Sequence, residues 1–138
     1  MTLQWRDGLS VGNDVIDSDH KYLIEIINRV EKSLGRNDRA GLTNSLDSLV
    51  HYSKTHFSAE EKIAHAVGYT HVPRLHDAHE KLIDKLDQIR AEIGDEWSSA
   101  SVEHFTELLR DWLINHVIKE DFLMKPFIVK HSPKFDPR

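Results

Sequence analysis

Apolar residues recur at steps of three and four along four stretches of the chain, at about residues 18–35, 39–67, 73–94 and 98–124. Such steps keep successive side chains on one face of an α-helix. The pattern therefore predicts four amphipathic helices, each with one buried face. Short polar breaks separate them, and helices joined by short loops pack as antiparallel neighbours. We expect an all-α, up-down-up-down four-helix bundle.

The segments outside these stretches are predicted to be less regular. Residues 1–17 should form an irregular N-terminal arm, with Asp17 or Ser18 capping the first helix through a side-chain oxygen. Pro126 lies where the fourth helix should end, because proline cannot continue the backbone hydrogen-bond pattern. A polar tail then runs to residue 138, and the whole chain, 1–138, is predicted to be a single domain.

Polar side chains that can bind metals interrupt the apolar stripes, at or just past positions where Leu or Ile would be expected. A buried polar group without a partner is costly. Several imidazoles and carboxylates that converge on one core without a cationic partner are better explained by a bound metal, and by two ions rather than one. These side chains are His20, His56, Glu60, His79, His116 and Asp121.

The spacing of these residues constrains their geometry. His56 and Glu60 are four apart and project from one helical face. His116 and Asp121 are five apart, which overshoots one turn, so Asp121 requires a helix end or a local bulge to reach the same site. Nitrogen and oxygen ligands suit iron, manganese, zinc or copper, and carboxylates can bridge two ions in a bundle core. The alternative is a set of core histidines bonded to the two carboxylates, which buries both carboxylates without a cation.

Composition narrows the possible partners. The chain has 30% charged and 39% hydrophobic residues, as folded domains do, and its net charge of −5 excludes a nucleic-acid partner. It has no cysteine, which excludes disulfides and thiolate ligands. Without a membrane-length apolar run or a signal-peptide pattern, we expect a cytoplasmic protein with no membrane partner.

Three motifs, which together cover the chain from the arm to about residue 128, resemble those of the bacterial hemerythrins. That family consists of four-helix bundles that hold a non-haem di-iron centre and bind dioxygen reversibly. The motifs are Trp5 with Val11-Gly12 and Asp17-Ser18-Asp19-His20; His56-Phe57-Ser58-Ala59-Glu60-Glu61 followed by Gly68-Tyr69; and Trp112-Leu113-Ile114-Asn115-His116 with Asp121.

The resemblance implies a cofactor of two iron ions, joined by two carboxylates and an oxo or hydroxo group. It implies the binding of dioxygen or a related diatomic, for storage, delivery or sensing, and of small ligands such as azide, nitric oxide or peroxide. The implied ligands are His20 and His56 on one iron, His79 and His116 on the other, and Glu60 and Asp121 as bridges.

The chain departs from the family at one position. The third helix of the family carries two histidines four apart on the same iron, but the residue four before His79 is Leu75. Three interpretations compete: His76 replaces the absent histidine, the iron keeps an extra open position, or that iron is bound weakly or not at all. The apolar stripe favours Leu75 as the inward residue and places His76 about 100° away from it.

The open position leads to alternative functions. An iron pair with two open positions favours catalytic turnover over simple reversible binding. The alternative function is therefore a di-iron peroxidase, oxidase or nitric-oxide-handling enzyme. A further alternative is a redox or oxygen signalling module that acts through an unidentified protein partner.

The residues predicted to line the ligand pocket are Leu75, Trp112, Leu113 and Val117. Glu61, which is rotated off the face of Glu60, is interpreted as a surface charge.

Overall fold

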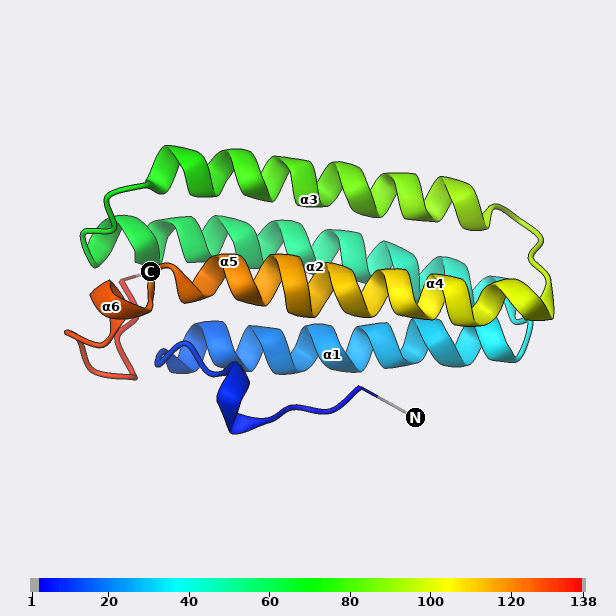
Figure 1. Ribbon diagram of the computed structural model, residues 1–138, viewed down its shortest axis with the longest axis horizontal. Helices are drawn as coiled ribbons and strands as arrows, with labels where there is room; N and C mark the ends of the chain where they lie inside the picture. The colour runs from blue at the N-terminus through cyan, green and yellow to red at the C-terminus, as the bar shows by residue number, and fades with distance from the viewer. Residues whose placement is uncertain (1–2, 138) are drawn as a thin grey trace.

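The computed structural model describes residues 3–137, apart from the side chain of His116, and within that range it is built of helices and turns without a strand. Figure 1 shows the long helical rods of the chain side by side. The first packs against the second and fourth, and the third also packs against the second and fourth, so the predicted up-down-up-down bundle is confirmed. The rods are α1 (Asp14–Gly35), α2 (Arg39–Ala66), α3 (Val72–Ile93) and a fourth that begins with α4 (Ser99–Asp111).

The fourth rod changes its helical geometry part-way along. α4 continues into η2 (Trp112–Ile118), a π-helical segment, and then into the short helix α5 (Lys119–Phe122). A π-helix bonds each residue to the one five positions away, so residues five apart come towards one face. This is the local bulge that the spacing of His116 and Asp121 predicts.

The interior consists of two apolar clusters that lie on either side of a polar layer. The larger, the core cluster, runs along most of the bundle. The smaller, the end cluster, lies where α2 turns into α3, and Ile63, Leu75 and Met124 belong to it. Each rod carries at least one polar residue between a member of the end cluster and a member of the core cluster. On the four rods in turn, the flanking pairs are Ile16 and Leu23 around His20, Ile63 and Phe57 around Glu60, Leu75 and Leu82 around His79, and Met124 and Ile118 around Asp121.

The N-terminal arm is shorter than expected. α1 begins at Asp14 because the buried side chain of Asn13 accepts hydrogen bonds from two backbone N–H groups of the first turn, at 3.0 and 3.1 Å. The expectation that Asp17 caps the helix was wrong, because Asp17 lies inside α1. Its carboxylate accepts a hydrogen bond from the backbone N–H of Val11 at 2.9 Å, which ties the arm to the helix. The arm also contains a short 3-10 helix, η1 (Asp7–Leu9).

The C-terminal tail is more structured than its polar composition indicates. The fourth rod ends at Phe122, and Pro126 lies in the first turn of a further helix, α6 (Lys125–Ile128), where its missing N–H costs nothing. The Nδ2 atom of Asn13 donates a hydrogen bond to the carbonyl oxygen of Phe135 at 2.9 Å. The cap of α1 therefore also fastens the tail to the bundle.

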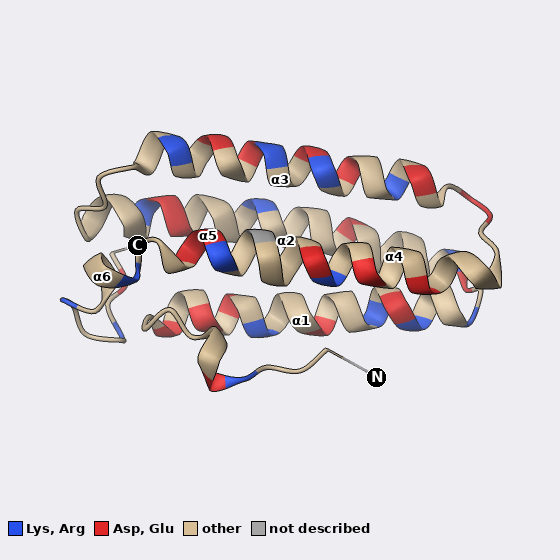
Figure 2. Cartoon of the chain, in the orientation of Figure 1, with Lys and Arg blue, Asp and Glu red and all other residues tan. Residues whose placement is uncertain are grey.

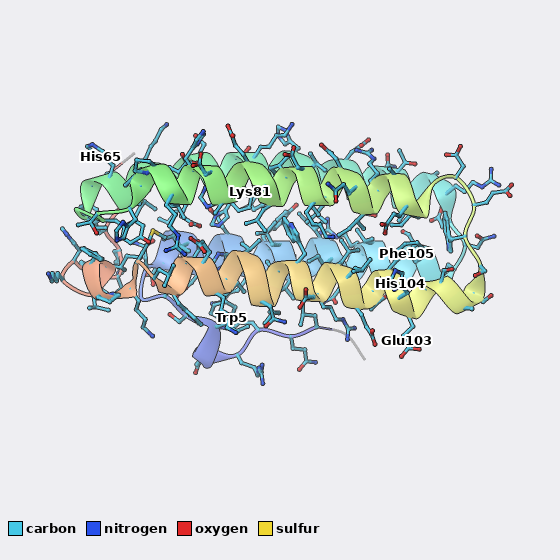
Figure 3. All side chains as sticks on the ribbon, turned by 45° about the horizontal axis from the view of Figure 1, so that its top comes forward. Trp5, His65, Lys81, Glu103, His104 and Phe105 are labelled. Carbon is cyan, nitrogen blue, oxygen red and sulfur yellow. The ribbon has the colours of Figure 1, made fainter. Side chains whose placement is uncertain are left out.

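The outer surface carries both signs of charge. Figure 2 shows acidic and basic residues alternating along the outward faces of the long helices, as solvated faces of a bundle do. Figure 3 shows the side chains filling the space between the rods and extending from their outer faces. None of the described helices combines the length and apolar character that spanning a bilayer requires.

Replacing Asn13 by Ala is expected to lower the free energy of unfolding by about 1–2 kcal/mol, because both the helix cap and the bond to the tail are lost. Asn13→Ser, which keeps a capping oxygen but not the amide donor, should lose less. Urea denaturation of the three proteins measures both effects. An equal loss for the two variants would show that the capping oxygen contributes nothing.

Candidate metal centre

The polar layer brings five of the six predicted metal ligands together from four rods. His20 comes from α1, His56 and Glu60 from α2, His79 from α3 and Asp121 from α5. All are buried, with exposed fractions between 0 and 3%. One potential ligand atom each from His20, His56, Glu60 and Asp121 lies within 4.8 Å of the others. The side chain of His116, the sixth, lies outside the described residues.

Each carboxylate of the layer contacts imidazoles from two different helices. The Oε2 atom of Glu60 is 2.8 Å from Nε2 of His56, while its Oε1 atom is 3.2 Å from Nε2 of His79. The Oδ2 atom of Asp121 is 2.7 Å from Nε2 of His20 and 3.8 Å from Nε2 of His56. The two oxygens of Glu60 thus face imidazoles on two different helices, the arrangement that a carboxylate bridging two cations needs.

Hydrogen bonding alone leaves this layer incomplete. Among the described side chains, Nε2 of His56, Oε2 of Glu60 and Oδ1 of Asp121 are buried without a hydrogen bond of acceptable geometry. Leaving one such group unsatisfied costs about 1–3 kcal/mol. A cation ligated by these atoms would satisfy them, and imidazole and carboxylate donors without sulfur suit a first-row transition metal. The residues therefore fit a non-haem metal.

The pKa values in the layer reflect burial and the charges that its members exert on one another. Burial lowers the pKa of His20. Burial also acts to lower the pKa of His56, but the neighbouring charge of Glu60 and the hydrogen bond that the imidazole donates to Asp19 raise it well above its usual value. Burial and the charge of Glu60 both raise the pKa of Asp121. The layer thus favours a positive charge beside its carboxylates, and a metal ion would displace protons from its ligands on binding.

Asp19 orients the imidazole of His56 through the ring nitrogen that faces away from the polar layer. Its Oδ2 atom is 2.9 Å from Nδ1 of His56, and the hydroxyl of Tyr52 donates a hydrogen bond to its Oδ1 atom at 2.7 Å. An acceptor at this ring nitrogen fixes the orientation of the imidazole, so Nε2 stays aimed at the polar layer. Sequence reasoning gave no role to Asp19 or to Tyr52.

Glu61 holds His79 in the same way, and its interpretation as a surface charge was wrong. Its side chain is only 23% exposed, and Oε2 is 3.0 Å from Nδ1 of His79. Its other oxygen is 2.7 Å from Nδ1 of His76. Asp19 and Glu61 each stand one position along the chain from a predicted ligand, which is the only signal for them in the sequence. Each supports a ligand on the neighbouring helix, so spacing along one helix does not find them.

Comparison with known proteins identifies the family. A model of the hemerythrin HHE cation-binding domain matches residues 11–128. The chain belongs to the hemerythrin family. A bacteriohemerythrin of Stenotrophomonas maltophilia is 28% identical over 135 residues, which cover 96% of this chain and 86% of that protein. A bacteriohemerythrin of Methylococcus capsulatus is 30% identical, over 86% and 88% of the two chains. A myohemerythrin of Riftia pachyptila is 27% identical, over 88% and 89%.

Two adjacent residues of α3, Leu75 and His76, lie in different surroundings. Leu75 is 1% exposed and packs in the end cluster, which confirms that it is the inward residue of the stripe. The side chain of His76 is 53% exposed and contacts Glu61 and Glu80, so the structure places it outside the polar layer. No second imidazole of α3 therefore joins His79 there.

The remaining predicted pocket residues belong to the apolar core. Trp112, Leu113 and Val117 are buried in the core cluster, and their contact with a bound ligand stays a prediction. Sequence reasoning did not single out Phe57, whose ring stacks on the imidazole of His79 with 4.1 Å between centroids. This stacking adds a packing contact to the hydrogen bond that orients His79.

Asp19→Ala is expected to weaken metal binding by about 10- to 100-fold, because His56 loses the acceptor that orients its ring. Competition with a chelator of known affinity measures the change. Asp14→Ala, which removes an exposed carboxylate from the first turn of the same helix, is the matched control. Equal affinities for the two variants would contradict an orienting role for Asp19.

Proposed function

We propose that this chain holds two non-haem iron ions and binds dioxygen or a related diatomic reversibly. The observation that carries the proposal is the placement of Glu60, whose two oxygens face His56 and His79 on different helices. The hemerythrin HHE family is described as cation-binding, and the similar proteins are named bacteriohemerythrins and myohemerythrin. An oxo or hydroxo group would complete the bridge between the ions.

In this proposal each iron takes its histidines from two of the four rods. His20 and His56 would hold one ion, and His79 and His116 the other, while Glu60 and Asp121 would be shared between them. The contacts of Asp121 with His20 and of Glu60 with His56 and His79 support this division. Ferrous iron, when bound, supplies the electrons for reversible dioxygen binding.

The protein would contribute orientation and the exclusion of water. Asp19 and Glu61 hold the rings of His56 and His79. The core and end clusters cover the polar layer on its two sides along the bundle axis. Excluding water limits the protons that reach the site, which favours reversible binding over oxidation of the iron.

The first test is the iron content together with the optical spectrum before and after azide is added. We expect about two irons per chain, as in carboxylate-bridged bundle cores, and a charge-transfer band of the oxidised protein that shifts on azide binding. Glu60→Gln should abolish the band because one bridge is lost. Glu103→Gln, an exposed change on α4, should leave it intact. One iron or mixed metals without such a band would contradict the proposal.

Leu75 favours a second candidate function. Because Leu75 is apolar and His76 points away from the layer, α3 offers one imidazole where a second ligand would close the iron site. An additional open position would place both irons within reach of small molecules. The alternative is therefore a peroxidase, an oxidase or an enzyme that handles nitric oxide.

Under this alternative, Leu75→His should suppress turnover with peroxide or nitric oxide, because the new imidazole fills the open position. Leu75→Met, which keeps the site apolar at similar volume, is the matched control and should retain turnover. Steady-state assays of the iron-loaded proteins measure both. Undiminished turnover in Leu75→His, with the iron content unchanged, would rule out the open position as the reactive one.

A further inference from the structure

A cavity of about 1010 Å³ opens between α2 and α3 and reaches the metal centre. Phe57, Glu61 and His76 are among the residues that line it, and so is His79. Of the five described ligands of the polar layer, His79 alone lines this cavity. A groove of about 460 Å³ between α3 and the fourth rod is lined by Ala78 and Trp112 among others, but by none of the described ligands.

Metal-binding groups lead without a gap from the mouth of this cavity to the buried layer. Each neighbouring pair is in direct contact. The contacts are Glu80 Oε1 to His76 Nε2 at 3.0 Å, His76 Nδ1 to Glu61 Oε1 at 2.7 Å, Glu61 Oε2 to His79 Nδ1 at 3.0 Å, and His79 Nε2 to Glu60 Oε1 at 3.2 Å. We call this series the donor ladder.

Exposure falls along the donor ladder. The side chain of Glu80 is 67% exposed and that of His76 is 53% exposed, whereas Glu61 is 23% exposed and Glu60 is fully buried. A cation that moves inward must shed water, and an unligated charge in a protein interior is strongly unfavourable. A nitrogen or oxygen donor at every step can replace each lost water.

We propose that the donor ladder is the passage by which divalent transition-metal ions enter and leave the centre. The inference rests on the proposed iron-binding function. Imidazole and carboxylate groups in alternation suit iron and its first-row neighbours. The ladder gives a role to His76, whose exposed imidazole lies between two carboxylates outside the polar layer.

Overall charge does not explain the passage. Lys54 and Lys62 line the same cavity as Glu61, Glu80 and Asp84, so cationic groups offset the carboxylates there. The selectivity for a metal ion comes instead from the contacts between successive donors. A variant that removes a donor should therefore slow metal transfer even though the cavity stays open.

The test follows iron release from the reduced, iron-loaded protein to an excess of a ferrous chelator. His76→Ala combined with Glu80→Gln should slow release about tenfold, the factor that about 1.4 kcal/mol on a barrier produces. The iron content before release should equal that of the parent. His65→Ala is the matched control, because His65 lines the same cavity without a place in the ladder, and Figure 3 shows it near the end of α2.

A steric pair of variants tests the route independently of its chemistry. Ser58→Trp places a bulky ring at an exposed lining position of the α2/α3 cavity and should slow release. Ala78→Trp places the same ring in the groove between α3 and the fourth rod and should not. If Ser58→Trp lowers the iron content, its release rate is not compared, and the variant that combines His76→Ala with Glu80→Gln tests the passage.

The outcomes separate the two proposals. Parent-like release from the donor variant, or equal slowing by His65→Ala, would overturn the passage while leaving the iron centre in place. Greater slowing by Ala78→Trp than by Ser58→Trp would overturn it as well, because the route would then run between α3 and the fourth rod. A parent protein without bound iron would refute the proposed function and this inference together.

Discussion

Two carboxylates and three imidazoles share one buried layer of an otherwise apolar bundle, and the rest of the structure depends on how their charge is balanced. Burial raises the pKa of Asp121, while the charge of Glu60 raises that of His56, so the layer favours a positive charge beside its carboxylates. Several buried atoms still lack hydrogen bonds. Because a cation would satisfy them only in the folded bundle, the free energy of metal binding would add to the stability of the fold.

The layer also fixes the register of the helices. Asp19 on α1 orients His56 on α2, and Glu61 on α2 orients His79 on α3. A shift of one residue in either helix would move the supporting carboxylate about 100° around its axis and leave the ring without an acceptor. Apolar clusters on both sides allow many packings, whereas these hydrogen bonds require one alignment.

Periodicity alone predicts most of this molecule. The stripes identify the four rods and most of the buried positions, and the five-residue step from His116 to Asp121 calls for a helix end or a bulge, which the π-helical segment provides. The roles of Asp19 and Glu61 were missed because each depends on a contact with another helix, and periodicity along one helix carries no information about such contacts. The start of α1 was missed for a different reason, because its local cap is Asn13 and not one of the expected residues.

Helix geometry also explains why the adjacent residues Leu75 and His76 of α3 have different surroundings. One position along a helix rotates a side chain by about 100°, so Leu75 packs in the end cluster while His76 faces the cavity. An inward imidazole at Leu75 would take an iron position and close it. An outward imidazole at His76 instead joins Glu61 to Glu80 and extends the contacts of His79 to the solvent. On the proposed function, Leu75 of α3 supplies no ligand to the centre, whereas His76 supplies a donor on the path to it. This combination favours exchange of the second ion over its permanent retention.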